Sequence, residues 1–249
     1  MPLEIPGPRV ILVEKELKLN EEFFIKGPSF QALLFREPRI GEAITVVDLK
    51  GKEFRARLLE ITSEKAKVVV FEEQLCTEPS FELWLLQALP DKERMELIIQ
   101  KTTELGVHVI IPFKSSRSIS LEEREVRQKK AHRWPHVALR ATKQCRRAFL
   151  PYVAPYCNLQ EALESVDPSF FKIMLYENAE VKFREALSTL SKPKGIAILV
   201  GPEGGWKEEE VDCAKKVGFL PCKVGNRILR TETAAILACA LTLFQFNEL

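Results

Sequence analysis

GIAILVGPEGGW, residues Gly195–Trp206, is an apolar run that ends in a glycine-rich loop. Its first part contains aliphatic residues without polar alternation, which is typical of a strand buried on both faces of a parallel sheet. Gly201, Gly204 and Gly205 let the backbone approach a ligand where a Cβ would not fit, and Pro202 fixes one φ angle. The stretch therefore predicts a buried strand followed by a stiff binding loop.

An amphipathic helix is predicted from Lys207 to Val217, directly after this loop. Glu208, Glu209 and Glu210 fall in its first turn, where carboxylates interact favourably with the positive end of the helix dipole. The same three acids disfavour a phosphate site at this helix end. Taken alone, such a glycine-rich turn is more often an ordinary strand-to-helix connection, so a second motif is needed to indicate function.

That second motif is VGNRILRTETAA, residues Val224–Ala235. GPEGGW and VGNRILRTETAA, in this order, closely resemble the RsmE-type members of the SPOUT methyltransferases, which make 3-methyluridine in 16S ribosomal RNA. The resemblance covers almost the whole chain. It implies an α/β fold in which a small PUA-like β-barrel domain precedes a trefoil-knotted SPOUT methyltransferase domain. It also implies a homodimer that uses S-adenosylmethionine, without a metal, on the 16S rRNA of the small ribosomal subunit.

The resemblance further implies which residues surround the cofactor. They come from three stretches of the chain: Leu175, Tyr176, Glu177, Val200, Gly201, Pro202, Glu203, Gly204, Gly205, Val224, Gly225, Asn226, Ile228, Leu229, Arg230, Thr233 and Ala234.

Methyl transfer to a uracil nitrogen needs an in-line approach and removal of the proton on N3. Glu203 and Glu232 are the carboxylates within the two motifs, and either is a candidate to accept that proton. Arg230 is a candidate to stabilise the uracil anion or to orient the RNA. Glu203 is equally suited to holding its loop by accepting backbone N–H groups.

Composition places the chain among soluble globular proteins, because 46% of its 249 residues are apolar and 29% are charged. Two domains are favoured at this length. Six cysteines without a C-x-x-C pair are predicted to be reduced thiols. The first ten residues do not form a signal-peptide pattern and no apolar stretch is long enough to span a membrane, so we expect a cytoplasmic protein.

Residues 1–76 are predicted to form the first domain. Short β-rich runs occur at residues 9–13, 43–47, 52–61 and 65–71, separated by turn residues, and this spacing suggests a small barrel. The family resemblance makes this barrel PUA-like and RNA-binding, with basic positions at Arg9 and Arg36. A solvated loop is the alternative for Arg36. Gln31 stands where many relatives have a histidine.

Residues 77–249 are predicted to form the methyltransferase domain, after a linker at Cys76–Ser80. Strands are expected at residues 81–89, 109–113 and 170–177, and helices at residues 92–105 and 182–190. A last helix, from Thr231 to Phe246, is apolar on nearly every face. Such a helix must be buried in its own core or against a partner.

The strongest charge signal lies between Arg127 and Arg147, where eight residues are Lys or Arg and none is acidic. Arg133, Arg140 and Arg147 are seven residues apart, so with Lys143 they would form a basic stripe on one helical face. A stripe of this kind fits RNA phosphates, and a solvated helix face is the alternative.

Arg117 is a further RNA-binding candidate, in a segment where relatives usually have an acid in place of Ser116. Arg140 likewise occupies a position where relatives commonly have Glu. His132 and His136 are four residues apart, but a zinc site is disfavoured because their neighbours include arginine and no carboxylate.

Two other functions were compatible with parts of the pattern. A SPOUT ribose 2′-O-methyltransferase is disfavoured by the pairing of the two motifs and by the N-terminal barrel. A non-catalytic RNA-binding protein on the same scaffold is disfavoured by the intact glycines and the intact Arg230–Thr233 segment.

Overall fold

The computed structural model describes residues 3–118, 122–123 and 133–249, and within it the chain divides into two compact units. We call them the antiparallel-sheet unit (Ile5–Glu78 and Leu139–Leu150) and the parallel-sheet unit (Met1–Glu4, Pro79–Ala138 and Pro151–Leu249). The change of unit after Glu78 lies two residues beyond the boundary expected from the sequence. The return of Leu139–Leu150 to the first unit was not expected, because nothing local in that segment indicates which sheet it packs against.

The parallel-sheet unit contains seven strands joined in the order β11-β9-β10-β5-β6-β7, with β8 also paired to β6. The strands are β5 (Glu82–Ala88), β6 (Val109–Lys114), β7 (Tyr152–Val153), β8 (Cys157–Asn158), β9 (Phe171–Leu175), β10 (Gly195–Val200) and β11 (Leu220–Cys222). The predicted strand at Gly195–Val200 is confirmed as β10, which is buried at every position and lies between β9 and β5. All of these pairings are parallel, as the unbroken apolar run predicts.

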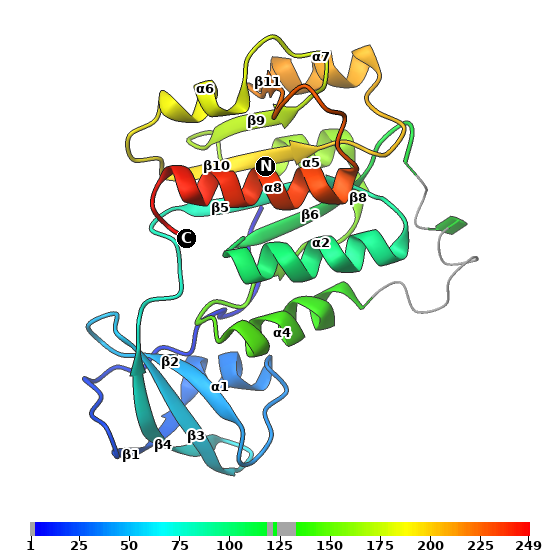
Figure 1. Ribbon diagram of the computed structural model, residues 1–249. Helices are drawn as coiled ribbons and strands as arrows, with labels where there is room; N and C mark the ends of the chain where they lie inside the picture. The colour runs from blue at the N-terminus through cyan, green and yellow to red at the C-terminus, as the bar shows by residue number, and fades with distance from the viewer. Residues whose placement is uncertain (1–2, 119–121, 124–132) are drawn as a thin grey trace. The chain divides into compact units, whose positions relative to one another are not determined.

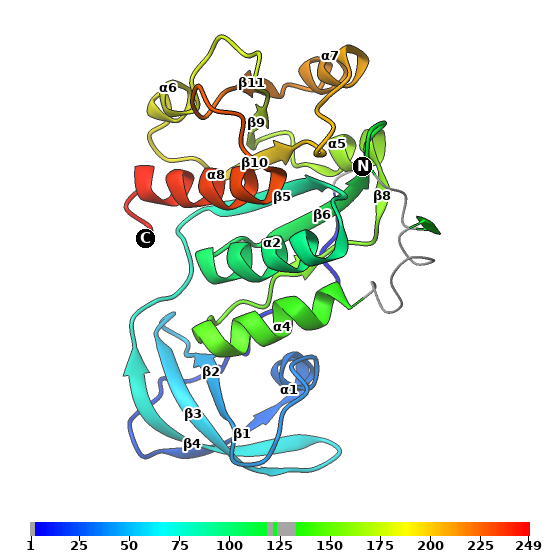
Figure 2. The ribbon, with the colours of Figure 1, turned by 45° about the vertical axis from the view of Figure 1, so that its right-hand side comes forward.

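Helices cover both faces of this sheet (Figures 1 and 2). They are α2 (Lys92–Leu105), α5 (Leu159–Ser165), α6 (Phe183–Ser188), α7 (Glu208–Lys216) and α8 (Thr231–Gln245). Helix α4 (Trp134–Cys145) begins in this unit, where Trp134, Val137 and Ala138 join the apolar core, and continues into the antiparallel-sheet unit. α8 packs beside α2 and across β10 and β5, and α5 lies behind the sheet in the view of Figure 1. The apolar core of the unit therefore sits between the sheet and the α2–α8 layer, with fully buried residues such as Leu85, Ile98 and Ala238.

Helix α2 begins and ends where its sequence signals predict. The Asp91 side chain caps its start by accepting a hydrogen bond from the Arg94 backbone N–H at 3.0 Å. Gly106 ends it in the left-handed region, with φ of 104°, which a residue with a side chain adopts at a cost. The Asp91 cap also fixes the backbone of Arg94, a residue of the functional site described below.

The antiparallel-sheet unit contains β1 (Glu22–Lys26), α1 (Gly27–Leu34), β2 (Ala43–Val47), β3 (Glu53–Ile61) and β4 (Lys65–Gln74). The strands form one antiparallel sheet in the order β1-β4-β3-β2 over a small apolar core. The runs at residues 43–47, 52–61 and 65–71 are confirmed as strands, whereas residues 9–13 form only a single bridge, between Leu12 and Val47. The small antiparallel sheet is what the structure shows, and the PUA-like barrel stays a prediction.

The six cysteines are all free, as the absence of a paired motif predicts. No helix in the described ranges is both long and apolar enough to cross a membrane.

Candidate functional site

The loops that follow β9, β10 and β11 converge at one edge of the parallel sheet, because these three parallel strands are neighbours and end at the same edge. They enclose a cavity of about 820 Å³ together with the start of α8 and one residue of α2. Every residue predicted to bind the cofactor lines this cavity except Thr233, which is exposed on α8. Residues that line it without having been predicted are Arg94, Asn178, Trp206, Cys222, Lys223, Arg227 and Thr231.

Trp206 explains why the loop after β10 begins with a glycine. A Cβ at Gly201 would lie 2.7 Å from the Trp206 indole, so the ring occupies the space that a side chain would need. The indole Nε1 donates a hydrogen bond to the Leu175 carbonyl at 2.9 Å, and the ring lies parallel to that of Phe113 with centroids 6.2 Å apart. The glycine-rich pattern predicts close approach of a ligand to the backbone. At Gly201 the close approach is instead made by Trp206, which connects the β10 loop to the end of β9.

A buried carboxylate holds the turn after β6 against the start of α7. Glu210 accepts hydrogen bonds from the Ser115 hydroxyl at 2.8 Å and from the Ser116 backbone N–H at 2.9 Å. Burial acts to raise the pKa of Glu210, but these hydrogen bonds and one from the Lys207 backbone N–H outweigh it and lower the pKa. The next residue, Arg117, donates to the Gly204 carbonyl at 2.8 Å. This turn therefore braces the glycine-rich loop from outside the cavity.

Thr231 joins the central strands to the start of α8. Its hydroxyl accepts a hydrogen bond from the Gln87 side-chain amide at 2.9 Å and donates one to the Gly201 carbonyl at 2.7 Å. Gln87 is fully buried on β5 and Thr231 is buried at the first turn of the helix. Two cavity-lining segments are thus fixed to each other through one hydroxyl.

The two candidate acids meet on one arginine. Arg94, from the first turn of α2, forms an ion pair with Glu203 through Nη1 and lies with its Nε 3.7 Å from Oε2 of Glu232. The hydrogen bond to Glu203 is the main reason why the pKa of Arg94 is raised above its ordinary value. Glu203 lines the cavity, whereas Glu232 lies beside it with a side chain only 14% exposed. Sequence reasoning missed Arg94 because it is far from both motifs along the chain.

Arg230 is placed differently from Arg94. It is the residue immediately before α8, its backbone is extended, and its side chain is exposed while still lining the cavity. No ion pair involving Arg230 occurs within the described part of the chain. Its guanidinium therefore faces solvent at the cavity, where an incoming substrate can reach it.

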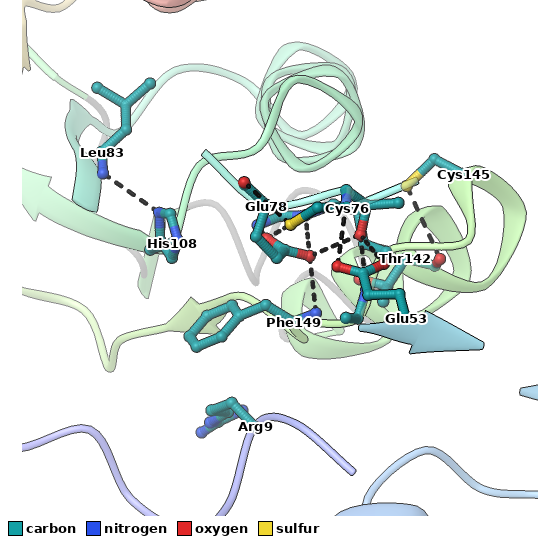
Figure 3. Close-up of polar contacts among 12 residues, drawn as sticks. Arg9, Glu53, Cys76, Glu78, Leu83, His108, Thr142, Cys145 and Phe149 are labelled. Carbon is teal, nitrogen blue, oxygen red and sulfur yellow. Dashed lines mark hydrogen bonds and ion pairs between the residues drawn. The ribbon is translucent and has the colours of Figure 1, made fainter. Parts of the chain in front are cut away.

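Two of the predicted RNA-binding arginines are buried inside the antiparallel-sheet unit, which does not fit a role at the surface. Arg147 is 3% exposed and its Nη2 lies 2.5 Å from Oε2 of Glu78. Glu78 also accepts a hydrogen bond from the Phe149 backbone N–H at 2.8 Å, as Figure 3 shows. Arg36 donates to the Arg9 carbonyl at 2.9 Å and to the Ala148 carbonyl, and burial lowers its pKa to about 10. Both arginines instead bind within the antiparallel-sheet unit and hold the segment Leu139–Leu150 in place there.

The remaining candidates vary in exposure. Arg117, Arg133 and Arg140 are exposed, Arg9 is half-buried, and the half-buried Lys143 pairs with Glu42 at 2.9 Å. The predicted stripe is therefore reduced to Arg140 on α4 and Arg133 directly before it, because Lys143 is paired with Glu42 and Arg147 lies beyond the end of α4 at Cys145. The basic residues from 127 to 130 and His132 lie outside the described residues. Across the ranges that are described, no group of three His, Cys, Asp or Glu is arranged to hold a metal ion.

Separate comparisons with known proteins agree on one family. Residues 77–243 match the model of the RNA methyltransferase domain. Ribosomal RNA small subunit methyltransferase E of Bacillus subtilis is 31% identical to this chain over 211 residues, which cover 82% of each of the two chains. Ribosomal RNA small subunit methyltransferase E of Buchnera aphidicola subsp. Acyrthosiphon pisum is 27% identical over 242 residues, which cover 96% of this chain and 94% of the relative.

A solved structure agrees with these relatives. The ribosomal RNA small subunit methyltransferase E from Neisseria gonorrhoeae, bound to S-adenosylmethionine, is 31% identical with a TM-score of 0.66, covering 96% of this chain and 98% of that one. The likeness therefore covers most of the chain in sequence and in fold, and this chain belongs to the ribosomal RNA small subunit methyltransferase E family.

Proposed function

We propose that this protein transfers a methyl group from S-adenosylmethionine to N3 of a uracil in the 16S rRNA of the small ribosomal subunit. The observation that carries the proposal is the convergence of the GPEGGW loop and the RILRTETA segment on a single cavity, beside two carboxylates and an exposed arginine. The family relationship supplies the substrate class and the cofactor, and the motif pairing supplies the choice of uracil N3.

The cavity suits a nucleoside-sized ligand. Its volume of about 820 Å³ lies within the range of small-molecule sites, and its lining combines glycines and apolar residues with charged and polar ones. Backbone groups from the three loops would bind the adenosine part of S-adenosylmethionine, with Leu175 and Leu229 as apolar contacts. When bound, the cofactor supplies an electrophilic methyl group on a sulfonium.

The chain's own residues would then have three tasks. The three loops align the methyl group with the attacking nitrogen, which contributes through proximity and orientation. A carboxylate, Glu203 or Glu232, accepts the N3 proton, and N3 forms the new bond to carbon as the sulfur–carbon bond breaks to leave S-adenosylhomocysteine. Arg230 stabilises the negative charge that develops on the uracil.

RNA contacts are assigned to the exposed basic residues. We propose that Arg117, Arg133 and Arg140 contact phosphates of the rRNA. The half-buried Arg9 of the antiparallel-sheet unit is proposed as a further contact. Arg36, Lys143 and Arg147 are left out, since Arg36 and Arg147 are buried and Lys143 is paired with Glu42. A PUA-like role for this unit, and a cytoplasmic site of action, belong to the same proposal.

The proposal also includes a trefoil-knotted backbone and a homodimer. The apolar residues that α8 leaves exposed support the second of these: Leu241 is 37% exposed and Phe244 is 71% exposed. Exposed large apolar side chains close to one another in sequence favour a protein interface, and a second copy of this chain is the occupant that the family resemblance suggests.

The function is tested by complementation. A bacterial strain that lacks its own 16S rRNA uracil-N3 methyltransferase should regain 3-methyluridine in its 16S rRNA when it expresses this chain, as measured by mass spectrometry of digested nucleosides. The Arg230→Ala chain is the matched control and should restore little. Failure of the well-expressed wild-type chain to restore 3-methyluridine would contradict the proposal.

A further inference from the structure

We infer that Arg94 is a positioning residue that supplies the counter-charge for the Glu203 and Glu232 carboxylates and holds them together beside the cavity. The inference rests on the proposed function for its catalytic meaning, because that function makes these two acids the candidate proton acceptors. The ion pairs themselves are features of the structure.

The geometry links three elements through one guanidinium. Arg94 is fixed at its backbone by the Asp91 cap of α2, and its Nε lies 3.3 Å from Oδ2 of Asp91. Its Nη1 pairs with Glu203 in the loop after β10, and its Nε lies 3.7 Å from Oε2 of Glu232 at the start of α8. A planar guanidinium with several donors suits such shared contacts better than an ammonium group does. Arg94 therefore connects the start of α2 with the two motifs that line the cavity.

The charges make Arg94 hard to replace. Three carboxylates, those of Asp91, Glu203 and Glu232, face this one cation. Oε2 of Glu232 is buried and has no hydrogen-bond partner, so its described counter-charge is the guanidinium alone. The other charged side chains around the cavity are Glu177, Lys223, Arg227 and Arg230, and none of them forms a described ion pair with Glu203 or Glu232.

Loss of Arg94 should therefore change how the acids titrate. A carboxylate that is poorly solvated and lies near other carboxylates is harder to ionise, so its pKa rises. A proton acceptor must be ionised, and the Arg94 guanidinium beside Glu203 and Glu232 supplies a positive charge that favours the ionised form. Without it, we expect Glu232, the less exposed of the two, to bind a proton at a higher pH than in the wild-type protein.

The first test does not depend on activity. Carboxyl carbons of ¹³C-labelled glutamate are titrated by NMR in the wild-type protein, in Arg94→Met and in Arg94→Lys, with Glu203→Gln and Glu232→Gln to assign the signals. The midpoint of Glu232 should rise in Arg94→Met and rise by less in Arg94→Lys, because the lysine keeps a positive charge at this position. Lys92→Met, which removes a surface partner of Glu96 from the same helix, is the control and should leave both midpoints unchanged.

The second test is the pH profile of rRNA methylation. The acidic limb of kcat/KM should move to higher pH in Arg94→Met and return towards the wild-type position in Arg94→Lys. Unchanged carboxyl midpoints in a folded Arg94→Met protein would overturn the inference. A wild-type protein that does not methylate rRNA, with midpoints that shift as expected, would instead overturn the proposed function and leave the role of Arg94 intact.

Discussion

Single residues set the shape of the cofactor loop. Gly201 is the sharpest case, because the space beside its Cα is filled by the Trp206 ring, which is itself bonded to the Leu175 carbonyl. Any side chain there must displace the indole and with it the connection between the β10 loop and the end of β9. Gly225, in contrast, has open space around the position of a Cβ and no positive φ.

We predict that Gly201→Ala lowers the free energy of unfolding by about 1–3 kcal/mol, the usual range for an overpacked site. The affinity for S-adenosylmethionine should fall by about tenfold or more, corresponding to about 1.4 kcal/mol. Denaturant unfolding and titration calorimetry measure the two effects. Gly225→Ala is the control for the fold and should unfold like the wild-type protein. Normal stability and affinity in Gly201→Ala would show that Trp206 does not constrain this loop.

Residues within contiguous motifs could be predicted from the sequence, whereas residues that reach the site from elsewhere could not. Gly201, Glu203 and Arg230 were found because each belongs to a short stretch with its own chemical pattern. Arg94 and Gln87 belong to an ordinary amphipathic helix and an apolar strand, and only the folded chain brings them to the two motifs. The burial of Arg147 could not be predicted from the sequence either, because its partner Glu78 lies in a different part of the sequence.

Elements are joined around the cavity by a few hydrogen bonds. The Thr231 hydroxyl is the clearest example, since it connects β5 and the β10 loop to the first turn of α8. Strands β5 and β10 could be predicted from their apolar runs, and α8 from its length and composition. Their connection through Thr231 could not, because a threonine at a helix start has several possible partners.

We predict that Thr231→Val destabilises the protein by about 1–3 kcal/mol, since it leaves the Gln87 amide and the Gly201 carbonyl without their partner. Binding of S-adenosylmethionine should weaken with it. Thr242→Val is a matched control in the same helix, because its buried hydroxyl donates to the Ala238 carbonyl of the preceding turn and, among the described residues, connects α8 to no other element. Thermal unfolding and calorimetry on both variants make the comparison. Equal effects of the two substitutions would argue against a special role for Thr231.

At the scale of the whole molecule, α8 shows why a fully apolar helix leaves two possibilities open. A helix apolar on nearly every face was expected to be buried in its own core or against a partner. The structure buries the face that carries Ala235, Ala238 and Leu243 against the sheet and α2. Leu241 and Phe244 stay exposed, because none of the residues that the structure describes covers them.

We therefore predict a dimer of about twice 28.5 kDa in solution at micromolar concentration. Light scattering after size exclusion measures this mass. Phe244→Asp should shift the protein towards the monomer, since a charge would be placed in an apolar interface. Leu75→Asp, at a 90% exposed leucine in the antiparallel-sheet unit, is the control and should leave the mass unchanged. A wild-type protein of 28.5 kDa would show that α8 is not a dimer interface.

The central claim is tested most directly by following the methyl group itself. The purified protein is incubated with S-adenosylmethionine carrying a deuterated methyl group and with small ribosomal subunits that lack the modification, and the 16S rRNA is digested to nucleosides. Mass spectrometry should find the label in 3-methyluridine, on the base fragment. Label on a ribose fragment or on another base, or no transfer to rRNA at all, would contradict the account.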